Sequence, residues 1–406
     1  MIAYHFPPVR VSSGIQRTLK FSQYLLEYGW RAIILSVKPM AYENVSDDQM
    51  AEVPENIVVK RVFALDTARH LTVKGRYFHW MALPDRWVTW CFGGVFAGLA
   101  LIKKYHPKFI WSTYPIATAH LIALILHRLT GVPWIADFRD SMTEENYPEN
   151  PIKRKIFRWI ERQTISRCYR VVFTTQGAIQ MYAERYPDIS SDKWTLIANG
   201  YDEENFIRAE KKISKDKGIN QIVLLHSGIL YPVERDPSFF FQALSELMIE
   251  GTINSEGLKI ILRATGHDDL IKNLVDQYGL NKLVFIEAGV PYESALAEMM
   301  TVDGLIVFQA SNCNHQIPAK IYEYLRARKP IFALTDPDGD TAAVLIDANI
   351  NSISSLDDKD SIKIKFSSFI EELKKGAAPV ANEKCVLGHS RKARTQLLAE
   401  LLNEGN

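Results

Sequence analysis

The chain has 406 residues, of which 47% are hydrophobic and 23% charged, with 21 glycines and 18 prolines. This composition excludes disordered, collagen-like and coiled-coil chains, and the length predicts two domains rather than one. The 48 basic and 47 acidic residues give a formal net charge of +1, which excludes recognition of nucleic acid by bulk charge. We therefore expect no nucleic-acid partner.

Apolar runs rich in β-branched residues alternate with helical patterns, which is typical of βαβ units and parallel sheets. In the first half, the predicted strands are 2–6, 32–37, 57–62, 109–112, 134–136, 171–174 and 195–197, and the predicted helices are 13–28, 88–104, 117–129, 151–169 and 178–186. In the second half, the predicted strands are 222–226, 259–264, 283–287, 304–307, 330–334 and 350–353, and the predicted helices are 237–250, 268–278, 292–300, 319–328 and 341–348.

The pattern occurs twice, and the polar, lysine-rich stretch 203–221 between the copies predicts a linker. We expect an α/β protein of two Rossmann-like, doubly wound parallel-sheet domains, 1–204 and 205–389, facing a central cleft. A last helix within 390–406 is expected to pack back on the first domain.

Cysteine spacing and the chain start point to a cytoplasmic location. Cys91, Cys168, Cys313 and Cys385 form no C-x-x-C pair, so neither a disulfide framework nor a zinc site is predicted. The first residues lack the pattern of a signal peptide. The most apolar run, 91–102, is shorter than the about 20 residues that span a bilayer.

Two loops of the first half carry candidate site residues, because ligands of doubly wound sheets bind at the carboxyl ends of the strands. After Phe6-Pro7-Pro8, a small-residue turn containing Gly14 offers backbone N–H groups to an anion or a sugar hydroxyl. The alternative is a turn that is only capped, by Ser12 or Ser13. It is not G-x-G-x-x-G, which argues against a nicotinamide or flavin enzyme.

The second loop, Asp137-Phe138-Arg139-Asp140, places two carboxylates and a guanidinium where catalytic groups are expected. The alternative is an Arg–Asp pair that only fixes the loop, and Asp140 is open to either role.

In the second half, a strand ends in His226-Ser227-Gly228, and Arg235 precedes the next helix. Further on, Gln316-Ile317-Pro318 leads into a helix with Pro318 in its first turn, whose free amides are candidate anion contacts. Lys320 and Glu323 lie on one face of that helix. A surface ion pair between them is the alternative.

These blocks follow one another in a recognisable order. They are Phe6-Pro7-Pro8, Asp137-Phe138-Arg139-Asp140, Asn199-Gly200-Tyr201-Asp202, His226-Ser227-Gly228, Arg235-Asp236-Pro237 and Ile317-Pro318-Ala319-Lys320-Ile321-Tyr322-Glu323-Tyr324. Over nearly the whole chain, this resembles the retaining GT-B glycosyltransferases of the large bacterial sugar-nucleotide-dependent group that builds surface polysaccharides and lipopolysaccharide.

The resemblance implies a donor site with contributions from both domains. Gly14 would approach the donor diphosphate or sugar, and Arg139 and Asp140 align with the catalytic loop. In the second domain, the resemblance assigns the phosphates to Gly228, Arg235 and Lys320 beside Gln316 and Pro318, the ribose hydroxyls to Glu323, and the nucleobase to the loop with Val290 and Tyr292. It implies no metal and no other cofactor.

Four departures from the family pattern stand out. His315 occupies the place of the first Glu of the E-x7-E pair that ends at Glu323. Gly228-Ile229 replaces the usual Gly-Arg, which leaves Arg235 alone of the usual Arg and Lys pair. The catalytic-loop His is absent, with Arg139 or Asp140 in its place. Relatives also have a few more residues before the first strand, so a slightly truncated start is expected.

The implied reaction moves a sugar from a UDP- or GDP-sugar to a saccharide or lipid-linked acceptor with retention. Basic side chains and helix amides would stabilise the departing diphosphate without a metal. The departing phosphate oxygen would take the acceptor proton, and Asp140 would orient the acceptor. Two alternatives remain open, namely a sugar-nucleotide 2-epimerase and an inactive GT-B subunit that binds nucleotide sugar or a partner.

A basic stretch indicates where the acceptor or a membrane would bind. Residues 60–170 hold 18 Lys and Arg against 8 Asp and Glu, hence a net charge of +10. Bases and aromatic residues mix within 69–105 and 152–170, which suits an anionic membrane or a lipid-diphosphate acceptor. The alternative is helices with their aromatic faces in the core, with Ile156, Trp159 and Ile160 as such a stripe. We expect peripheral contact with the inner face of the cell membrane.

Overall fold

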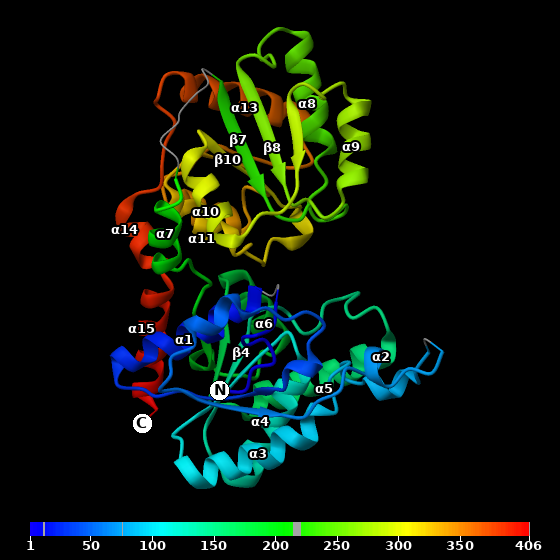
Figure 1. Cartoon of the computed structure of the whole chain (residues 1–406), viewed down its shortest axis with the longest axis vertical. Helices are drawn as coiled ribbons and strands as arrows, with labels where there is room; N and C mark the ends of the chain where they lie inside the picture. The colour runs from blue at the N-terminus through cyan, green and yellow to red at the C-terminus, as the bar shows by residue number, and fades with distance from the viewer. Residues whose placement is uncertain (11–12, 75, 214–220, 406) are drawn as a thin grey trace. The chain divides into compact units, whose positions relative to one another are not determined.

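The computed structural model describes residues 1–10, 13–74, 76–213 and 221–405, which form two compact units (Figure 1). Unit 1 contains Met1–Asn199 and Arg391–Asn406, and unit 2 contains Gly200–Ser390. Each unit is built on parallel strands covered by helices. The predicted α/β class with two Rossmann-like units is confirmed.

Unit 1 has two parallel ladders. One contains β1 (Ile33–Val37) and β2 (Val58–Val62), and the other contains β3 (Ile110–Thr113), β4 (Trp134–Phe138), β5 (Arg170–Phe173) and β6 (Trp194–Leu196). Ile2 joins them through parallel bridges to Leu35 and Ser112. The predicted strand over 2–6 is therefore wrong in extent, because the ladder is reduced to the bridges at Ile2. Pro7 and Pro8, which have no N–H to donate, follow at a turn.

Helices cover both faces of the unit 1 sheet. The α-helices of unit 1 are α1 (Ser13–Tyr24), α2 (Thr67–His70), α3 (Trp90–Tyr105), α4 (Ala117–Thr130), α5 (Pro151–Arg167), α6 (Gln176–Arg185) and α15 (Arg391–Glu404). Trp111, Ile135 and Val172 share a core cluster with residues of α1 and α15, whereas the alternate residues Trp134 and Phe138 belong to the cluster of α3 to α6. Side chains of successive strand residues point to opposite faces, so the sheet is buried on both sides.

Unit 2 contains a six-stranded parallel sheet in the order β12-β11-β10-β7-β8-β9. The strands are β7 (Ile222–Ser227), β8 (Leu258–Arg263), β9 (Val284–Glu287), β10 (Gly304–Phe308), β11 (Ile331–Leu334) and β12 (Ile353–Ser354). Read from β9, this is the doubly wound order 3-2-1-4-5-6. The order reverses between β7 and β10, and ligands of such sheets bind at the carboxyl ends of the strands at this switch point.

The helices of unit 2 are α7 (Glu203–Glu210), α8 (Ser238–Ile249), α9 (Asp268–Gln277), α10 (Tyr292–Thr301), α11 (Lys320–Ala327), α12 (Asp340–Asp347), α13 (Lys359–Lys374) and α14 (Glu383–Gly388). The linker predicted over 203–221 is partly wrong, because its first residues form α7. Arg326 of α11 holds α7 by donating from Nε to Glu203 Oε2 at 2.7 Å. Residues 214–220 of that stretch lie outside the described residues.

Candidate functional site

The switch point of unit 2 is built around His226, the buried second-to-last residue of β7. Its Nδ1 lies 2.9 Å from the Ile306 carbonyl oxygen on β10, and its Nε2 lies 3.4 Å from Lys320 Nζ on α11. Burial, followed by the positive charge of Lys320, holds the pKa of His226 well below its usual range. A neutral imidazole therefore ties β7, β10 and α11 together.

Gly228 makes room for Lys320 at the end of β7. Its φ is +121°, and a Cβ built on it would lie 2.5 Å from Lys320 Nζ. A residue with a side chain would be strained there and would displace the ammonium group. The close approach explains why a glycine is needed at this position.

The ammonium group of Lys320 sits in a site that disfavours its charge. Burial and the nearby Arg235 lower the pKa of Lys320 to about 7, and Glu323 acts in the opposite direction. An anion bound beside Lys320 would favour the charged form. The side chain is half-buried and contacts His226, so a simple surface ion pair with Glu323 does not describe it.

Arg235 adds a second positive charge to this site. Its Nη1 donates to the Ile229 carbonyl oxygen at 2.8 Å, and its guanidinium lies over the Tyr231 ring at 5.2 Å. The charge of Arg235 contributes to the lowered pKa of both His226 and Lys320. The structure thus brings the predicted residues Gly228, Arg235 and Lys320 into one cationic cluster at the switch point.

The predicted ribose and nucleobase residues also meet. Tyr292 is the first residue of α10, and its hydroxyl donates to Glu323 Oε1 at 2.6 Å. Val290 lies two residues earlier on the loop after β9 and is partly exposed. The loop predicted to hold the base is therefore joined to the carboxylate predicted to hold the ribose.

The segment before α11 is fixed from behind. Nε2 of the buried Gln309 donates to the carbonyl oxygens of Cys313 and Gln316, at 2.8 Å each. The Gln316 side chain is exposed, and His315 is half-buried. Pro318 does not lie in the first turn of the helix as predicted, because α11 begins at Lys320 with Ala319 as its N-cap. The Pro318 carbonyl oxygen instead accepts from Ile321 N at 2.9 Å.

Tyr324 is a supporting residue that sequence reasoning missed. It is fully buried, and its hydroxyl oxygen accepts a hydrogen bond from Ser227 N at 2.9 Å. It follows Lys320 by four residues and therefore lies on the same face of α11. The four-residue spacing from Lys320 could have indicated this role from the sequence. A second polar side chain on that face of α11 would also reach the end of β7.

In unit 1, Asp137 has a structural role in a buried ion pair. Arg17 Nη2 lies 2.8 Å from Asp137 Oδ1, and both side chains are buried. The Arg17 guanidinium also donates to the carbonyl oxygens of Ile197 and Ala198, and Thr113 Oγ1 donates to Asp137 Oδ2 at 3.0 Å. An ion pair thus fixes Asp137, and its arginine is Arg17 of α1.

Arg139 and Asp140 follow β4 at the carboxyl edge of the unit 1 sheet. Burial lowers the pKa of Arg139, Asp140 and Asp137 oppose the shift, and Arg17 adds to it. Asp140 is exposed. His5 was not predicted as a site residue, yet burial and the charge of Arg139 lower its pKa to about 4. Its place at the end of the first predicted strand was the available signal.

Gly14 lies buried in the first turn of α1, whereas its neighbour Ser12 lies outside the described residues. Among the residues that the structure describes, no group of three or more His, Cys, Asp or Glu side chains could hold a metal ion. No helix within the described ranges is both long and apolar enough to cross a membrane.

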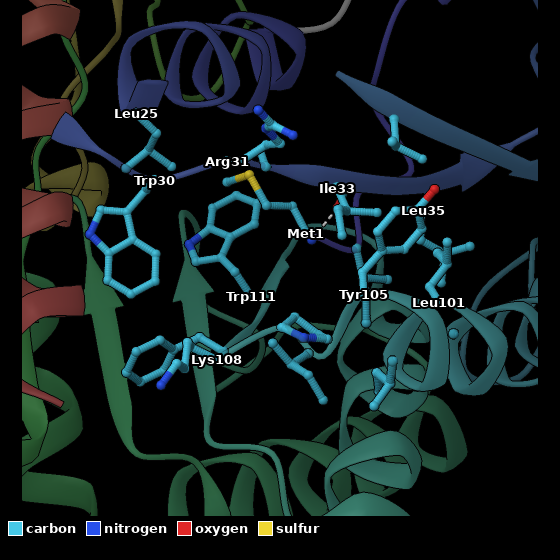
Figure 2. Close-up of a pocket in the computed structure, with 18 of the residues that line it drawn as sticks. Met1, Leu25, Trp30, Arg31, Ile33, Leu35, Leu101, Tyr105, Lys108 and Trp111 are labelled. Atoms are coloured by element: carbon cyan, nitrogen blue, oxygen red, sulfur yellow. Dashed lines mark hydrogen bonds between the residues drawn. The ribbon is translucent and has the colours of Figure 1, made fainter. Parts of the chain in front are cut away.

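A cavity of about 350 Å³ lies at the opposite, amino-terminal edge of the unit 1 sheet. Figure 2 shows its apolar lining, which includes Leu25, Trp30, Leu101 and Trp111. Among the residues that the structure describes, its lining includes none of the predicted site residues and no carboxylate side chain. Its position and chemistry separate it from the candidate site.

Comparisons with known proteins agree with this architecture. Residues 17–200 match the model of the Glycosyl transferase 4-like domain. Sucrose-phosphate synthase from Thermosynechococcus elongatus is 14% identical, with a TM-score of 0.68 over 99% of this chain and 97% of that one. HepE from Anabaena, in complex with UDP-glucose, is 14% identical, with a TM-score of 0.67 over 99% of both chains.

A third similar structure is the UDP-forming alpha,alpha-trehalose-phosphate synthase from Burkholderia xenovorans, in complex with glucose-6-phosphate. It is 11% identical, with a TM-score of 0.60 over 98% of this chain and 96% of that one. No curated protein sequence matches the chain. The chain thus has the two-domain GT-B fold, and its residues 17–200 are similar to the Glycosyl transferase 4-like domain.

Proposed function

We propose that the chain transfers a sugar from a UDP- or GDP-sugar to a saccharide or lipid-linked acceptor, with retention and without a metal ion. The observation that carries this proposal is the cationic cluster of Gly228, Arg235 and Lys320 at the switch point of unit 2. A diphosphate is the donor group whose charge this cluster fits.

The donor is proposed to lie along the residues that the structure joins in unit 2. Its phosphates contact Lys320, Arg235 and the amides at the start of α11. Its ribose hydroxyls donate to the Glu323 carboxylate, which the Tyr292 hydroxyl already orients at 2.6 Å. Its base lies against the loop that contains Val290 and Tyr292. No part of this arrangement requires the missing first Glu of the E-x7-E pair.

The proposed chemistry uses the protein mainly to stabilise charge. The bond between the anomeric carbon and the phosphate oxygen breaks with its electron pair on the diphosphate, where Lys320 and Arg235 stabilise the new charge. The acceptor oxygen bonds to the anomeric carbon on the same face, and its proton passes to the departing phosphate oxygen. In unit 1, Asp140 is proposed to orient the acceptor hydroxyl, and Gly14 and Arg139 are proposed to contact a sugar.

We further propose that the chain works in polysaccharide or cell-surface glycan synthesis, in the cytoplasm and in peripheral contact with the membrane. The net charge of +10 over residues 60–170 supports this location, since cytoplasmic membrane surfaces are anionic.

Thermal shifts with UDP, GDP, CMP and their sugars test the donor assignment, because a ligand that binds the folded state raises its stability by mass action. The proposal expects stabilisation by a nucleoside diphosphate in the intact chain and its loss in Lys320→Ala. Lys272→Ala, an exposed lysine on α9, is the matched control. Conversion of the donor without acceptor would instead indicate an epimerase, and binding without any turnover would indicate an inactive subunit.

A further inference from the structure

Two segments that are distant in the chain are joined at the surface of unit 1. Asn150 Nδ2 lies 3.1 Å from His79 Nε2, and Asn150 Oδ1 accepts from Lys153 N to cap α5. The loop that contains His79 is therefore held against the first turn of α5. We call the exposed side chains of this region the docking surface, defined as Val73, Lys74, Arg76, Phe78, Trp80, Ile152, Lys155, Arg158 and Trp159.

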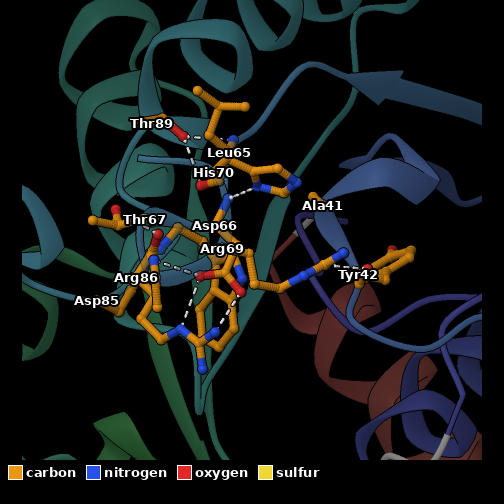
Figure 3. Close-up of polar contacts among 12 residues, drawn as sticks. Ala41, Tyr42, Leu65, Asp66, Thr67, Arg69, His70, Asp85, Arg86 and Thr89 are labelled. Atoms are coloured by element: carbon orange, nitrogen blue, oxygen red, sulfur yellow. Dashed lines mark hydrogen bonds and ion pairs between the residues drawn. The ribbon is translucent and has the colours of Figure 1, made fainter. Parts of the chain in front are cut away.

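The loop that carries the first part of the docking surface is anchored at its base (Figure 3). Arg86 donates to both carboxylate oxygens of Asp66, at 2.9 and 2.6 Å. The buried Thr67 hydroxyl contacts the carbonyl oxygens of Met81 and Arg86, at 3.0 Å each. Thr89 Oγ1 exchanges hydrogen bonds with the backbone of Leu65. The segment that contains the exposed rings of Phe78 and Trp80 is thus held by hydrogen bonds at both of its ends.

The apolar side chains of the docking surface are turned outward. Phe78 and Trp80 are 71% and 69% exposed, and their rings are stacked with centroids 6.4 Å apart. On α5, Ile152 is 62% exposed and Trp159 is 52% exposed, although the sequence pattern allowed Trp159 a place in the core. Large apolar groups gathered in this way indicate a surface that is covered by a partner.

The charged side chains of the docking surface are all basic. Within the described residues, the side chains of Lys74, Arg76, Lys155 and Arg158 make no hydrogen bond or ion pair in the structure. Arg162, one turn beyond Arg158, is likewise exposed and without such a contact among these residues. Glu161, which lies between Arg158 and Arg162, is buried, and Glu149 is the exposed acid nearest to these α5 residues along the chain. A partner with anionic groups would pair with these cations.

Aromatic rings between basic residues suit the interface of an anionic bilayer, where rings lie at the level of the headgroups and bases contact phosphates. We infer that the docking surface binds an anionic lipid bilayer and holds unit 1 against it. The inference deepens the membrane contact in the proposed function and rests on that part of it. Lipid binding is measured without donor or acceptor, so its failure leaves the transferase proposal standing.

The test is sedimentation of the full chain with vesicles of phosphatidylcholine alone or mixed with phosphatidylglycerol. We expect binding to the mixed vesicles that weakens with salt, and little binding to neutral vesicles. The double variants Phe78→Ser/Trp80→Ser and Lys155→Glu/Arg158→Glu should each lower the apparent affinity by about tenfold or more.

Matched controls come from unit 2. Ile249 and Ile364 are 84% and 72% exposed, and Ile249→Ser/Ile364→Ser replaces two exposed apolar side chains of that unit. Lys272→Glu/Lys282→Glu makes the same charge change there. We expect both controls to bind vesicles as the unaltered chain does.

Unaltered thermal unfolding and nucleotide binding show that a variant is folded. If a double variant fails to fold, Trp80→Phe replaces it, with quenching of tryptophan fluorescence by brominated phosphatidylglycerol as the readout. The inference expects quenching in the unaltered chain that falls in Trp80→Phe. Absence of binding to anionic vesicles would overturn the inference, and so would equal binding by the docking-surface variants and the control variants. Either result is also what a surface that binds a protein instead of a bilayer would give.

Discussion

Gly228 and Lys320 approach so closely that a Cβ on residue 228 would stand 2.5 Å from the lysine Nζ. Gly228→Ala should therefore displace the ammonium group and also strain a backbone with φ of +121°. We expect an about tenfold or greater loss of nucleotide affinity, together with a loss of roughly 1–2 kcal/mol in the free energy of unfolding. Titration calorimetry and chemical denaturation measure the two effects.

The variant Gly251→Ala is a control that distinguishes the effect of backbone strain from the effect of displacing the Lys320 ammonium group. Gly251 also has a positive φ, of +73°, but no atom of the described residues lies within 4 Å of its Cβ position. We expect this control to lose stability and keep its nucleotide affinity. If Gly228→Ala binds nucleotide as well as Gly251→Ala does, the close approach has no role in binding.

The pKa of Lys320, lowered to about 7, predicts a pH dependence of donor binding. An anionic diphosphate prefers the charged lysine, so binding should be tightest below pH 7 and weaken as the pH rises through that value. Lys320→Arg keeps the charge at all these pH values and should flatten the profile. Calorimetry between pH 6 and about pH 9 checks the sign. A profile that is the same in both proteins would contradict the assignment.

Substitutions of Glu323 and Tyr292 should weaken the binding of the nucleoside part of the donor rather than the binding of its phosphates. Glu323→Ala removes a charged acceptor and should weaken nucleoside diphosphate binding by about 10- to 100-fold, and Tyr292→Phe should weaken it by only a few-fold. Pyrophosphate, which lacks the ribose and base, is the matched ligand, and its binding should change much less, through the altered charge beside Lys320 alone. An equal loss for pyrophosphate would place Glu323 elsewhere.

The two aspartates of the loop after β4 should behave differently. Asp137→Asn leaves the buried Arg17 without its ion pair and should cost about 3–5 kcal/mol of the free energy of unfolding. Asp140 is exposed, so Asp140→Asn should change stability by less than about 0.5 kcal/mol.

If Asp140 orients the acceptor, Asp140→Asn should also slow transfer while the affinity for donor stays the same. Denaturation curves and initial rates measure the two properties separately. Unaltered transfer by Asp140→Asn would remove Asp140 from the mechanism.

Much of the fold could be predicted from the sequence because its strands are short apolar runs bounded by loops. Two copies of this pattern were enough to predict two Rossmann-like units. The first strand was overestimated, because Ile2 to Phe6 reads as a strand although the ladder contact is confined to Ile2. The helix α7 was instead missed, because its polar sequence resembles a linker. Its partner Arg326 lies more than 100 residues further along the chain, so nothing near α7 in the sequence indicates a helix there.

In the candidate site, too, some residues could be predicted from the sequence and others could not. Gly228, Lys320 and Glu323 could be named from motifs, because each lies at the end of a predicted strand or the start of a predicted helix. The pairing of Arg17 with Asp137 joins residues 120 positions apart, and nothing local in the sequence indicates it. The contact of His226 with Lys320 likewise depends on how β7 and α11 pack. Such partners are set by tertiary structure.

Sugar transfer by this chain should depend on the cationic cluster of unit 2. The most direct measurement incubates the chain with labelled UDP- and GDP-sugars and a panel of saccharide and lipid-linked acceptors, and determines the product linkage by NMR. We expect a glycosidic product that retains the donor's anomeric configuration, released together with a nucleoside diphosphate. We also expect that Lys320→Ala abolishes this product while Lys272→Ala does not. Equal turnover by these two variants, or no transfer from any donor, would contradict this expectation.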